Sequence, residues 1–268
     1  MLQTDAGIGL FEEFVEEAYP GMRAVIFAAG LGTRLYPYTK DKPKALVEIR
    51  GTAMLGHTLQ KMKAAGIKDV VVNVHAFADK VESYLNDYSL TNPEMQIQVS
   101  DERALLLETG GGLKKMQSML EDDAFIVHNV DVLSSIDLNA LEEADLHFSA
   151  ENSLRLATLA VRKTESDRYF LFNESGLLCG WENVKTGEQK ISRPLEKNLQ
   201  RFGFTGIHLI HPELFPLMTE EGVFSITDVY LRLASNHEIR MFDVSDAEWF
   251  DIGSPEQLRL AEEKADWI

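Results

Sequence analysis

Apolar and polar positions alternate along the first half of the chain in a way that predicts strands and helices in turn. Short apolar runs bounded by turn residues have the length of buried strands, and the segments between them place apolar residues at helical spacing. The predicted strands are 24–28, 69–74, 96–100 and 124–128, and the predicted helices are 55–65, 77–85 and 112–120. Because strands that alternate with helices form largely parallel sheets covered on both faces, this half is predicted to be α/β.

The pattern changes beyond residue 154. Three strand-like segments follow one another there, with turns at 173–176 and 186–187, which predicts an antiparallel hairpin insertion. The predicted strands of the insertion are 154–161, 168–173 and 177–184. The alternation then returns with strands at 204–210, 239–244 and 248–251, a helix at 226–234 and a final helix from Pro255.

Residues 1–21 differ from the rest of the chain. Phe11, Phe14 and Val15 recur at helical spacing among glutamates, which predicts a short acidic amphipathic helix that ends at Pro20. This N-terminal acidic extension would pack on the body or on a neighbouring subunit; a disordered tail and a mis-assigned start are the alternatives. A single domain is predicted over 22–268.

Composition and charge restrict the class of partner. The 268 residues are 45% hydrophobic, enough to bury the core of one sizeable α/β domain. The formal net charge of -17 argues against a broad attraction to nucleic acid or to an anionic membrane, so an anionic substrate must be held by local cations and metal. The lone cysteine, Cys179, excludes an internal disulfide framework and fits a reducing compartment. With no apolar run of bilayer length and no signal-like N-terminus, we expect a cytoplasmic protein.

The segment AVIFAAGLGTRLYPYTKDKPKAL, residues 24–46, has the features of a polyphosphate-binding turn. Gly30 and Gly32 let the backbone turn sharply after the first strand and bring bare N–H groups close to an anion. Arg34 adds a planar cation and Lys44 a compact one, both suited to phosphate oxygens. The residues expected to bind nucleotide in this turn are Ala29, Gly30, Gly32 and Thr33.

Two common phosphate-binding motifs do not fit this turn. A dinucleotide-binding GxGxxG needs glycine where Leu35 stands, and a P-loop needs Lys-Ser or Lys-Thr directly after its last glycine. Residues 30–46 instead resemble, position by position, the motif GxGTRLxPxTxxxPKxL of the sugar-phosphate nucleotidyltransferases, also called nucleotide-sugar pyrophosphorylases. The resemblance runs from about Met22 to the C-terminus. It is closest to short members such as N-acetylmuramate-1-phosphate uridylyltransferases and mannose-1-phosphate guanylyltransferases.

The resemblance implies both a fold and an activity. The fold is a three-layer αβα, Rossmann-like nucleotidyltransferase (glycosyltransferase-A-like) fold with a mixed, mainly parallel central sheet and a small antiparallel hairpin insertion. The hairpins and the sugar site would occupy about 154–212. The activity is transfer of a nucleoside monophosphate from a nucleoside triphosphate to a sugar 1-phosphate, with release of pyrophosphate and with Mg²⁺ as cofactor. Arg34, Lys44 and Asp131 are then the expected catalytic residues.

Two aspartates at strand ends are candidate magnesium ligands, because magnesium is commonly held by one or two carboxylates together with phosphates and waters. Asp131 follows the predicted strand 124–128, at an end where open α/β sheets bind ligands. Asp251 lies in WFDIGSPE, which resembles the family pattern WxDIGTPE with Ser254 in place of threonine. The family often has Gly-Asp or Asp-x-Asp where this chain has Asn-Val-Asp, which leaves the role of Asn129 open.

Three further segments resemble parts of the family that contact substrate. In ETGGG, which is predicted to open a helix with bare amides, Thr109, Gly110 and Gly111 would contact the nucleoside. Glu196 and Lys197 resemble a pair that binds the sugar hydroxyls and the sugar phosphate, and Thr205 and Gly206 resemble the floor of the sugar site. Candidates for base selection are Glu102 and Arg103.

The sequence leaves other functions open. A nucleotidyltransferase for a non-sugar phosphate such as phosphocholine would use the same turn, and a non-catalytic nucleotide-sugar-binding regulator would keep the same fold. The expected partners are a nucleoside triphosphate and a sugar 1-phosphate, without nucleic acid or membrane, in a monomer or small homo-oligomer. Neither the base nor the sugar follows from the sequence.

Overall fold

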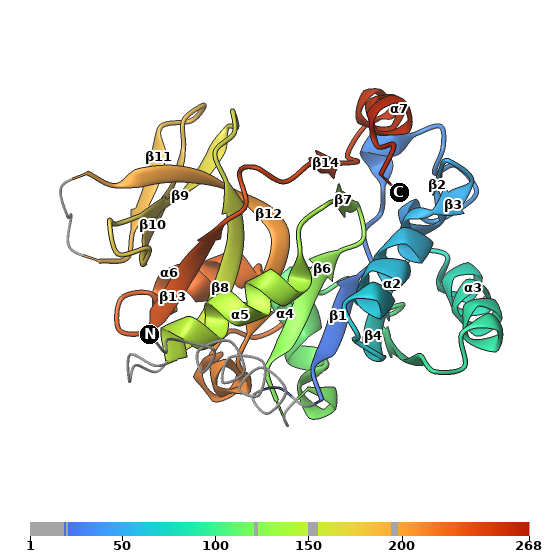
Figure 1. The fold of residues 1–268 in the computed structure, drawn as a ribbon, viewed down its shortest axis with the longest axis horizontal. Helices are drawn as coiled ribbons and strands as arrows, with labels where there is room; N and C mark the ends of the chain where they lie inside the picture. The colour runs from blue at the N-terminus through green and yellow to red at the C-terminus, as the bar shows by residue number, and fades with distance from the viewer. Residues whose placement is uncertain (1–18, 20, 121–122, 150–154, 194–197, 268) are drawn as a thin grey trace, which may run out of the picture.

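The chain folds around a ten-stranded mixed β-sheet with helices on both faces, as the computed structural model in Figure 1 shows. The structure describes residues 19, 21–120, 123–149, 155–193 and 198–267. The predicted acidic helix therefore lies outside the described residues. Within the described ranges, no helix is both long enough and apolar enough to cross a bilayer.

The elements alternate as predicted in the first half and turn to consecutive strands in the second. The strands are β1 (Arg23–Phe27), β2 (Glu48–Ile49), β3 (Thr52–Ala53), β4 (Asp69–Val74), β5 (Gln96–Asp101), β6 (Phe125–Asn129), β7 (Val132–Ser134), β8 (Arg155–Arg162), β9 (Arg168–Phe172), β10 (Leu178–Asn183), β11 (Glu188–Ile191), β12 (Gln200–Ile210), β13 (Glu238–Asp243) and β14 (Trp249–Asp251). The α-helices are α2 (Met54–Ala64), α3 (Ala78–Thr91), α4 (Glu108–Lys115), α5 (Leu138–Ser149), α6 (Ile226–Leu233) and α7 (Pro255–Lys264), and the 3-10 helices are η1 (Thr33–Leu35), η2 (Lys44–Leu46), η3 (Gln117–Met119) and η4 (Pro212–Leu217).

The central sheet is mixed and mainly parallel, which confirms the predicted fold class. β5, β4, β1 and β6 lie side by side and parallel. β12 then pairs antiparallel with both β6 and β8, so β8 runs in the same direction as β6. β13 pairs parallel with β8 at the far edge. The carboxyl ends of β1, β6 and β8 therefore meet at one edge of the sheet.

The predicted antiparallel insertion is present in part. β9 and β10 pair antiparallel as predicted, and β11 extends them into a three-stranded lobe, whereas the first predicted strand of the insertion, 154–161, corresponds to β8 of the central sheet. This lobe joins the main sheet through β12, whose first residues, 200–202, pair with β9. The later part of β12 pairs with β8 and β6, and its register shifts between Phe204 and His208. Gly206 lies in this bulge with φ of 82°, a left-handed conformation that glycine adopts without steric cost.

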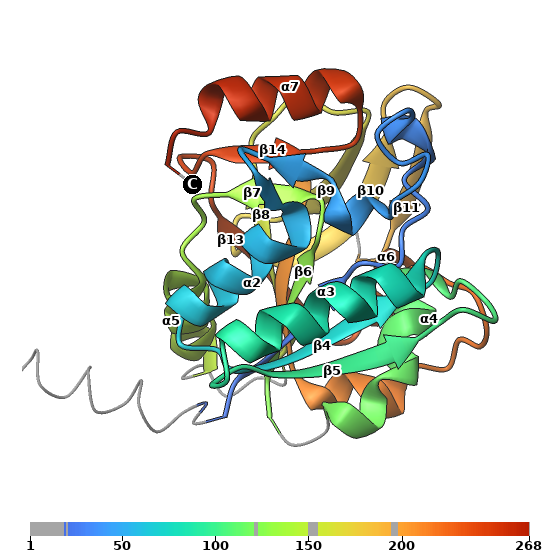
Figure 2. The same ribbon diagram turned by 90° about the vertical axis from the view of Figure 1, so that its right-hand side faces the viewer.

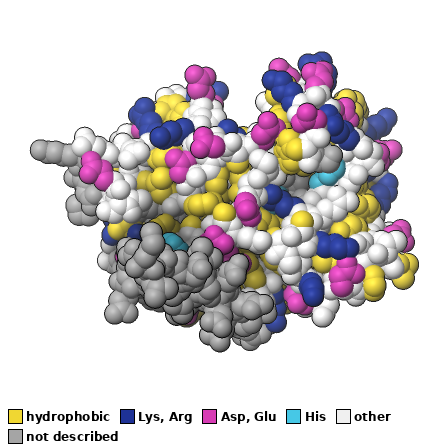
Figure 3. Space-filling view, in the orientation of Figure 1, with side chains coloured by type: hydrophobic (Ala, Val, Ile, Leu, Met, Phe, Trp, Pro, Cys, Tyr) yellow, Lys and Arg dark blue, Asp and Glu magenta, His cyan; other side chains and the backbone are white. Residues whose placement is uncertain are grey.

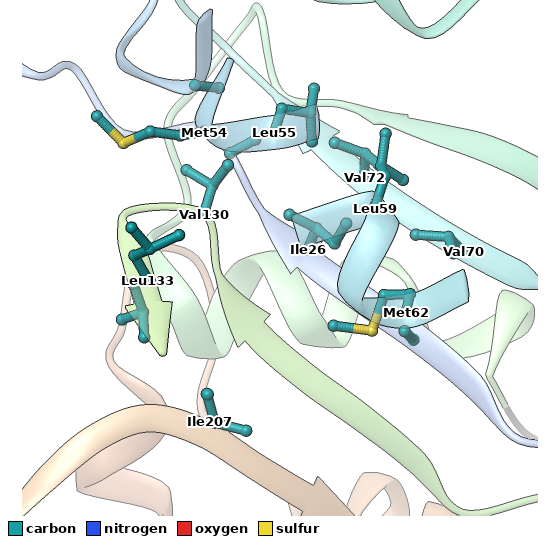
Figure 4. Close-up of a cluster of buried hydrophobic side chains, with 14 of the residues drawn as sticks. Ile26, Met54, Leu55, Leu59, Met62, Val70, Val72, Val130, Leu133 and Ile207 are labelled. Atoms are coloured by element: carbon teal, nitrogen blue, oxygen red, sulfur yellow. The ribbon is translucent and has the colours of Figure 1, made fainter. Parts of the chain in front are cut away.

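Two apolar clusters, one on each face of the sheet, hold the layers together. One lies under α2, α3 and the start of α5, and the other lies under α4, η4 and α6. Figure 4 shows side chains of α2 such as Leu55, Leu59 and Met62 packed against Ile26 of β1 and Val72 of β4. Each such buried side chain contributes about 1.5–3 kcal/mol, so the face under α2 is a large part of what fixes β1 in place. Figure 2 shows α7 lying across the end of the molecule that carries β14.

Several boundaries differ from the sequence prediction. α3 extends to Thr91, beyond the predicted helix end at residue 85. β12 begins at Gln200, before the predicted strand start at residue 204. β7, α5 and β11 were not predicted. The most consequential difference is α4, which begins at Glu108 rather than Gly112 and so contains all three consecutive glycines.

Candidate active site

The glycine-rich turn follows β1 and is fixed by contacts with the Pro-Lys segment. Gly32 has φ of 65°, and the Thr39 hydroxyl donates to the Gly32 carbonyl at 2.9 Å. A Cβ on Gly32 would lie 2.9 Å from Cβ of Lys44, so the turn packs on the lysine stem only because this residue has no side chain. Gly30 is exposed, and a Cβ there would meet nothing within 4 Å. The strict requirement for glycine thus falls on Gly32.

An asparagine of β4, which the sequence analysis missed, holds the start of this turn. The Asn73 side chain accepts from the amides of Ala28 at 2.7 Å and Ala29 at 3.2 Å through its Oδ1. Its Nδ2 donates to Glu102 at 2.8 Å, and the other carboxylate oxygen of Glu102 accepts from the Leu107 amide at 3.1 Å. The Ala29 amide therefore already has an acceptor in Asn73.

Asn73 and Glu102 have a structural function in this arrangement. Both are buried, with exposed fractions of 3% and 1%. Together they join the turn after β1 to the start of α4, so Glu102 is not free to select a base. The signal available in the sequence was a single polar residue inside the apolar strand DVVVNV. Arg103, the other candidate, lies on the surface and pairs with Asp79, Glu82 and Asp101.

Arg34, Lys44 and the two candidate aspartates come together at the carboxyl ends of β1 and β6. The Lys44 ammonium forms an ion pair with Oδ2 of Asp131, and their side chains are 9% and 25% exposed. The Arg34 guanidinium faces Gly253, since a Cβ on that glycine would lie 3.3 Å from Nη1 of Arg34. Residues separated by more than 200 positions thus form one constellation, as the sequence analysis predicted for these four residues.

Backbone pairing places Asp251 beside Asp131. β14 pairs antiparallel with β7, with Asp251 opposite Val132, and the Ile252 amide donates to the Asp131 carbonyl at 2.8 Å. The Val130 amide in turn donates to the Phe27 carbonyl at 3.1 Å, which ties this turn to β1. The position of both carboxylates is therefore set by main-chain hydrogen bonds rather than by flexible loops.

The electrostatics of the pair favour a cation. Burial raises the pKa of the Asp251 carboxyl, and the neighbouring Asp131 raises it further, while Lys44 and Arg34 act in the opposite direction. A divalent cation shared by the two carboxylates would relieve that repulsion. The described residues contain no group of three or more His, Cys, Asp or Glu placed to hold a metal. Two carboxylates with open positions for phosphate and water fit magnesium, which dehydrates reluctantly.

The ETGGG segment forms the packed start of α4. Its nucleoside contacts were expected because its backbone amides would be bare, and the structure contradicts that reason. The amides of Gly110 and Gly111 both donate to the Phe224 carbonyl, at 2.9 and 3.2 Å, so they are not bare. A Cβ on Gly110 would lie 2.4 Å from the Phe224 ring. The hydroxyl of Thr109 accepts from the Ile226 amide at 3.0 Å. The glycines thus allow α4 to approach the 222–226 segment closely.

The predicted sugar-site residues fall into two groups. Glu196 and Lys197 lie outside the described residues. Thr205 is 1% exposed and donates its hydroxyl to the Ala160 carbonyl at 2.7 Å, so its side chain supports the β12 bulge. A Cβ on Gly206 would lie 2.6 Å from Nδ2 of Asn129, which places the Asn129 side chain against β12. Gly206 therefore has a packing function beside the aspartate turn.

Comparisons with known proteins show which family the chain resembles. A family model described as nucleotidyl transferase matches residues 23–266. An N-acetylmuramate alpha-1-phosphate uridylyltransferase of Caulobacter vibrioides is 33% identical over 243 residues, which span 90% of this chain and 95% of the relative. A mannose-1-phosphate guanyltransferase of Yarrowia lipolytica is 28% identical over 246 residues, which span 88% of this chain and 62% of that protein.

Among solved structures, a putative glucose-1-phosphate thymidylyltransferase from Bacillus anthracis has a similar fold. It superposes with a TM-score of 0.73 and 20% sequence identity, over 92% of this chain and 96% of that one. A UDP-glucose pyrophosphorylase complexed with UDP-glucose gives a TM-score of 0.68 and 16% identity, over 91% of this chain and 98% of the other. At these identities the likeness supports the fold.

Proposed function

Because the chain belongs to the nucleotidyl transferase family, we propose that it is an enzyme that transfers a nucleoside monophosphate from a nucleoside triphosphate to a sugar 1-phosphate. The observation that carries the proposal is the constellation of Arg34, Lys44, Asp131 and Asp251 at one edge of the sheet. A decayed, purely binding relative would have no need to keep two cations and two carboxylates together.

The reaction forms one P–O bond and breaks another. An oxygen of the sugar phosphate attacks the α-phosphorus, and the bond to the β-phosphate breaks, so that pyrophosphate leaves with the electron pair. The sugar phosphate is already ionised near neutral pH, so no general base is needed. Catalysis then depends on position and on charge stabilisation.

Each side chain has a distinct task in this proposal. Arg34 and the turn at Gly32 bind the outer phosphates of the triphosphate, and Lys44 stabilises the charge that develops at the α-phosphate. In the structure Lys44 pairs with Asp131, so the triphosphate competes with this carboxylate for the ammonium. Asp131 and Asp251 would hold magnesium, which supplies neutralising charge to phosphate oxygens when it is bound.

The acceptor and the base are finer proposals. The curated relatives include two N-acetylmuramate alpha-1-phosphate uridylyltransferases, so UTP with N-acetylmuramate 1-phosphate is the first pair to test. Glu196 and Lys197 are proposed to bind the acceptor, and Thr109 the nucleoside, on the family resemblance. We expect the enzyme in the cytoplasm.

A matrix of substrates tests the function. Four nucleoside triphosphates are combined with a panel of sugar 1-phosphates and with phosphocholine, and pyrophosphate release is measured with magnesium and with EDTA. We expect turnover with one base and one sugar 1-phosphate, dependent on magnesium. The variant Asp131→Ala, checked for folding by circular dichroism, should lose this turnover. Release of pyrophosphate by folded Asp131→Ala at the wild-type rate would contradict the assignment, and so would turnover with phosphocholine alone.

A further inference from the structure

Arg162, the last residue of β8, has a guanidinium nitrogen without a hydrogen-bond partner and lies over Trp249 of β14. Its Nε atom is buried and has no hydrogen-bond partner, and no ion pair joins its guanidinium to another residue in the described part of the chain. The guanidinium carbon lies 5.3 Å from the centroid of the Trp249 ring, a cation–π contact that orients its plane. Because no protein group satisfies this guanidinium in the described part of the chain, it has a hydrogen-bonding capacity that a ligand at its outer N–H groups would use.

The position of Arg162 follows from β14. Trp249 and Asp251 are two residues apart on this strand, so their side chains leave the same face with Cα atoms about 7 Å apart. Trp249 is held in place because its Nε1 donates to the Thr205 carbonyl at 3.0 Å. Arg162 therefore lies on a fixed aromatic surface, and the residue that supplies this surface is two positions along β14 from Asp251.

The two arginines contact different ends of the 249–253 segment. Arg34 faces Gly253, two residues after Asp251, whereas Arg162 faces Trp249, two residues before it. An in-line transfer needs cationic contacts both for the leaving phosphates and for the attacking group. With Arg34 assigned to the outer phosphates, Arg162 is the cation of this segment that is left for the acceptor. Figure 3 shows the outline of the molecule dipping between the β9–β11 lobe and the lobe that carries α7.

We propose that Arg162, oriented by Trp249, binds an anionic oxygen group of the acceptor and thereby determines which acceptors are used. This inference rests on the proposed function. A guanidinium stays charged at all working pH values and presents a planar fork that matches the paired oxygens of a carboxylate or a phosphate. In a chain of net charge -17, an anionic acceptor needs such a local cation. The oxygens come either from the 1-phosphate or from a carboxylate elsewhere on the sugar.

The variant Arg162→Gln tests the proposal against Lys163→Gln, which removes the same charge one position along the chain. Acceptor binding is measured by calorimetry with glucose 1-phosphate and with N-acetylmuramate 1-phosphate, and KM is measured separately for acceptor and for triphosphate. We expect Arg162→Gln to weaken acceptor binding about tenfold to a hundredfold, the loss of a charged hydrogen-bonded contact. The KM for the triphosphate should stay within about twofold of wild type, and Lys163→Gln should bind the acceptor as wild type does.

The two acceptors distinguish the source of the oxygens. Equal losses with both acceptors would assign the contact to the 1-phosphate, and a loss confined to N-acetylmuramate 1-phosphate would assign it to the carboxylate. Arg162→Lys keeps the charge without the fork, so it should recover part of the binding and gives a second variant if Arg162→Gln is unstable. Unchanged acceptor binding in both variants, or an equal rise in the KM for the triphosphate, would overturn the inference. Failure of the proposed function would instead appear as absent turnover in the wild type.

Discussion

At the scale of single residues, Lys44 is the cation that the proposed function assigns to the reacting phosphate. It is buried and already paired with Asp131, so its removal affects both the triphosphate and the carboxylate. We predict that Lys44→Met lowers kcat for pyrophosphate release by about 10²–10³-fold, the usual cost of losing one charge-stabilising donor. Lys42→Met, at a half-exposed lysine two positions earlier, is the matched control and should keep near wild-type kcat. Equal kcat values for the two variants would contradict the role of Lys44.

The charged carboxylate of Asp251 is predicted to reduce the stability of the metal-free protein. Its folded-state pKa lies above the ordinary value of 3.8, because burial and Asp131 disfavour its charge. The folded state then holds this proton more tightly than the unfolded state, so stability falls as pH rises through that window and the penalty persists at neutral pH. Asp251→Asn should therefore raise Tm in EDTA at pH 7 while abolishing turnover.

Two measurements check this prediction. Thermal unfolding in EDTA should show the Tm advantage of Asp251→Asn at pH 7 and its decline at more acidic pH. Addition of magnesium and nucleoside triphosphate should raise the wild-type Tm more than that of the variant. A lower Tm for Asp251→Asn in EDTA at pH 7 would show that the charge is stabilising in the metal-free state.

The sequence predicted the charged residues of the candidate site better than the residues around them. Arg34, Lys44, Asp131 and Asp251 stand in short motifs, each of which indicates its chemistry by itself, and the structure brings the four together. Asn73 and Arg162 contact segments far away in the sequence, so no local pattern marks them. Gly110 and Gly111 were expected to have free amides, and only the fold shows that the Phe224 carbonyl accepts from them.

At the scale of elements, α4 depends on close approach to the 222–226 segment. A Cβ on Gly110 would lie 2.4 Å from Cδ2 of Phe224 and 2.9 Å from its carbonyl oxygen, so the backbone would have to move. Alanine favours a helix by up to about 1 kcal/mol over glycine, but such overpacking costs about 1–3 kcal/mol. Gly110→Ala is thus predicted to lower the free energy of unfolding, measured in urea. Gly21→Ala, where a Cβ meets nothing within 4 Å, should unfold at the wild-type midpoint or above it, and a wild-type midpoint for Gly110→Ala would refute the packing argument.

Elements were predictable where their hydrophobic period was long enough to read. β1, β4 and β6 are buried on both faces and appear as continuous apolar runs, so their existence was clear. β7 has three residues, too few to show any period, although it is the strand that positions Asp251. The sequence contains a signal for α5 that was overlooked, the helix-capping residue Asp137. Its side chain accepts from the amides of Asn139 and Ala140 at the helix start.

At the scale of the whole molecule, a buried polar cluster around Asp145 of α5 joins distant parts of the chain. Asp145 is fully buried and accepts from Arg155 of β8 at 2.7 and 2.6 Å, from the Tyr19 hydroxyl at 2.8 Å, and contacts His211 at 3.0 Å. Burial raises the pKa of Asp145, but the hydrogen bond and charge of His211, the charge of Arg155 and a hydrogen bond from Thr158 outweigh burial and hold it below its ordinary value. The cluster fastens the segment before β1 to the opposite half of the sheet.

Asp145→Ala should destabilise the protein by about 3–5 kcal/mol, because it leaves the buried Arg155 charge without its partner. Because the pKa of Asp145 is lowered, its contribution to stability is fully present at a pH above the ordinary pKa. This contribution is lost as the pH falls through the folded-state pKa. Urea unfolding at pH 7 measures the loss, and Asp167→Ala, in an exposed ion pair, is the control with a change below about 1 kcal/mol. A difference of less than 1 kcal/mol between the two variants would contradict the assignment.

The course of β12 has a consequence for how changes in the β9–β11 lobe reach the aspartates. The first residues of β12, 200–202, pair with β9, and its last residues, beyond the Gly206 bulge, pair with β6 beside the aspartates. The lobe also packs into the core on one face of the sheet, since Phe170 and Phe172 belong to the same buried cluster as Val127 of β6. A substitution that shifts the lobe is therefore transmitted to the aspartate edge both along one continuous strand and through close packing.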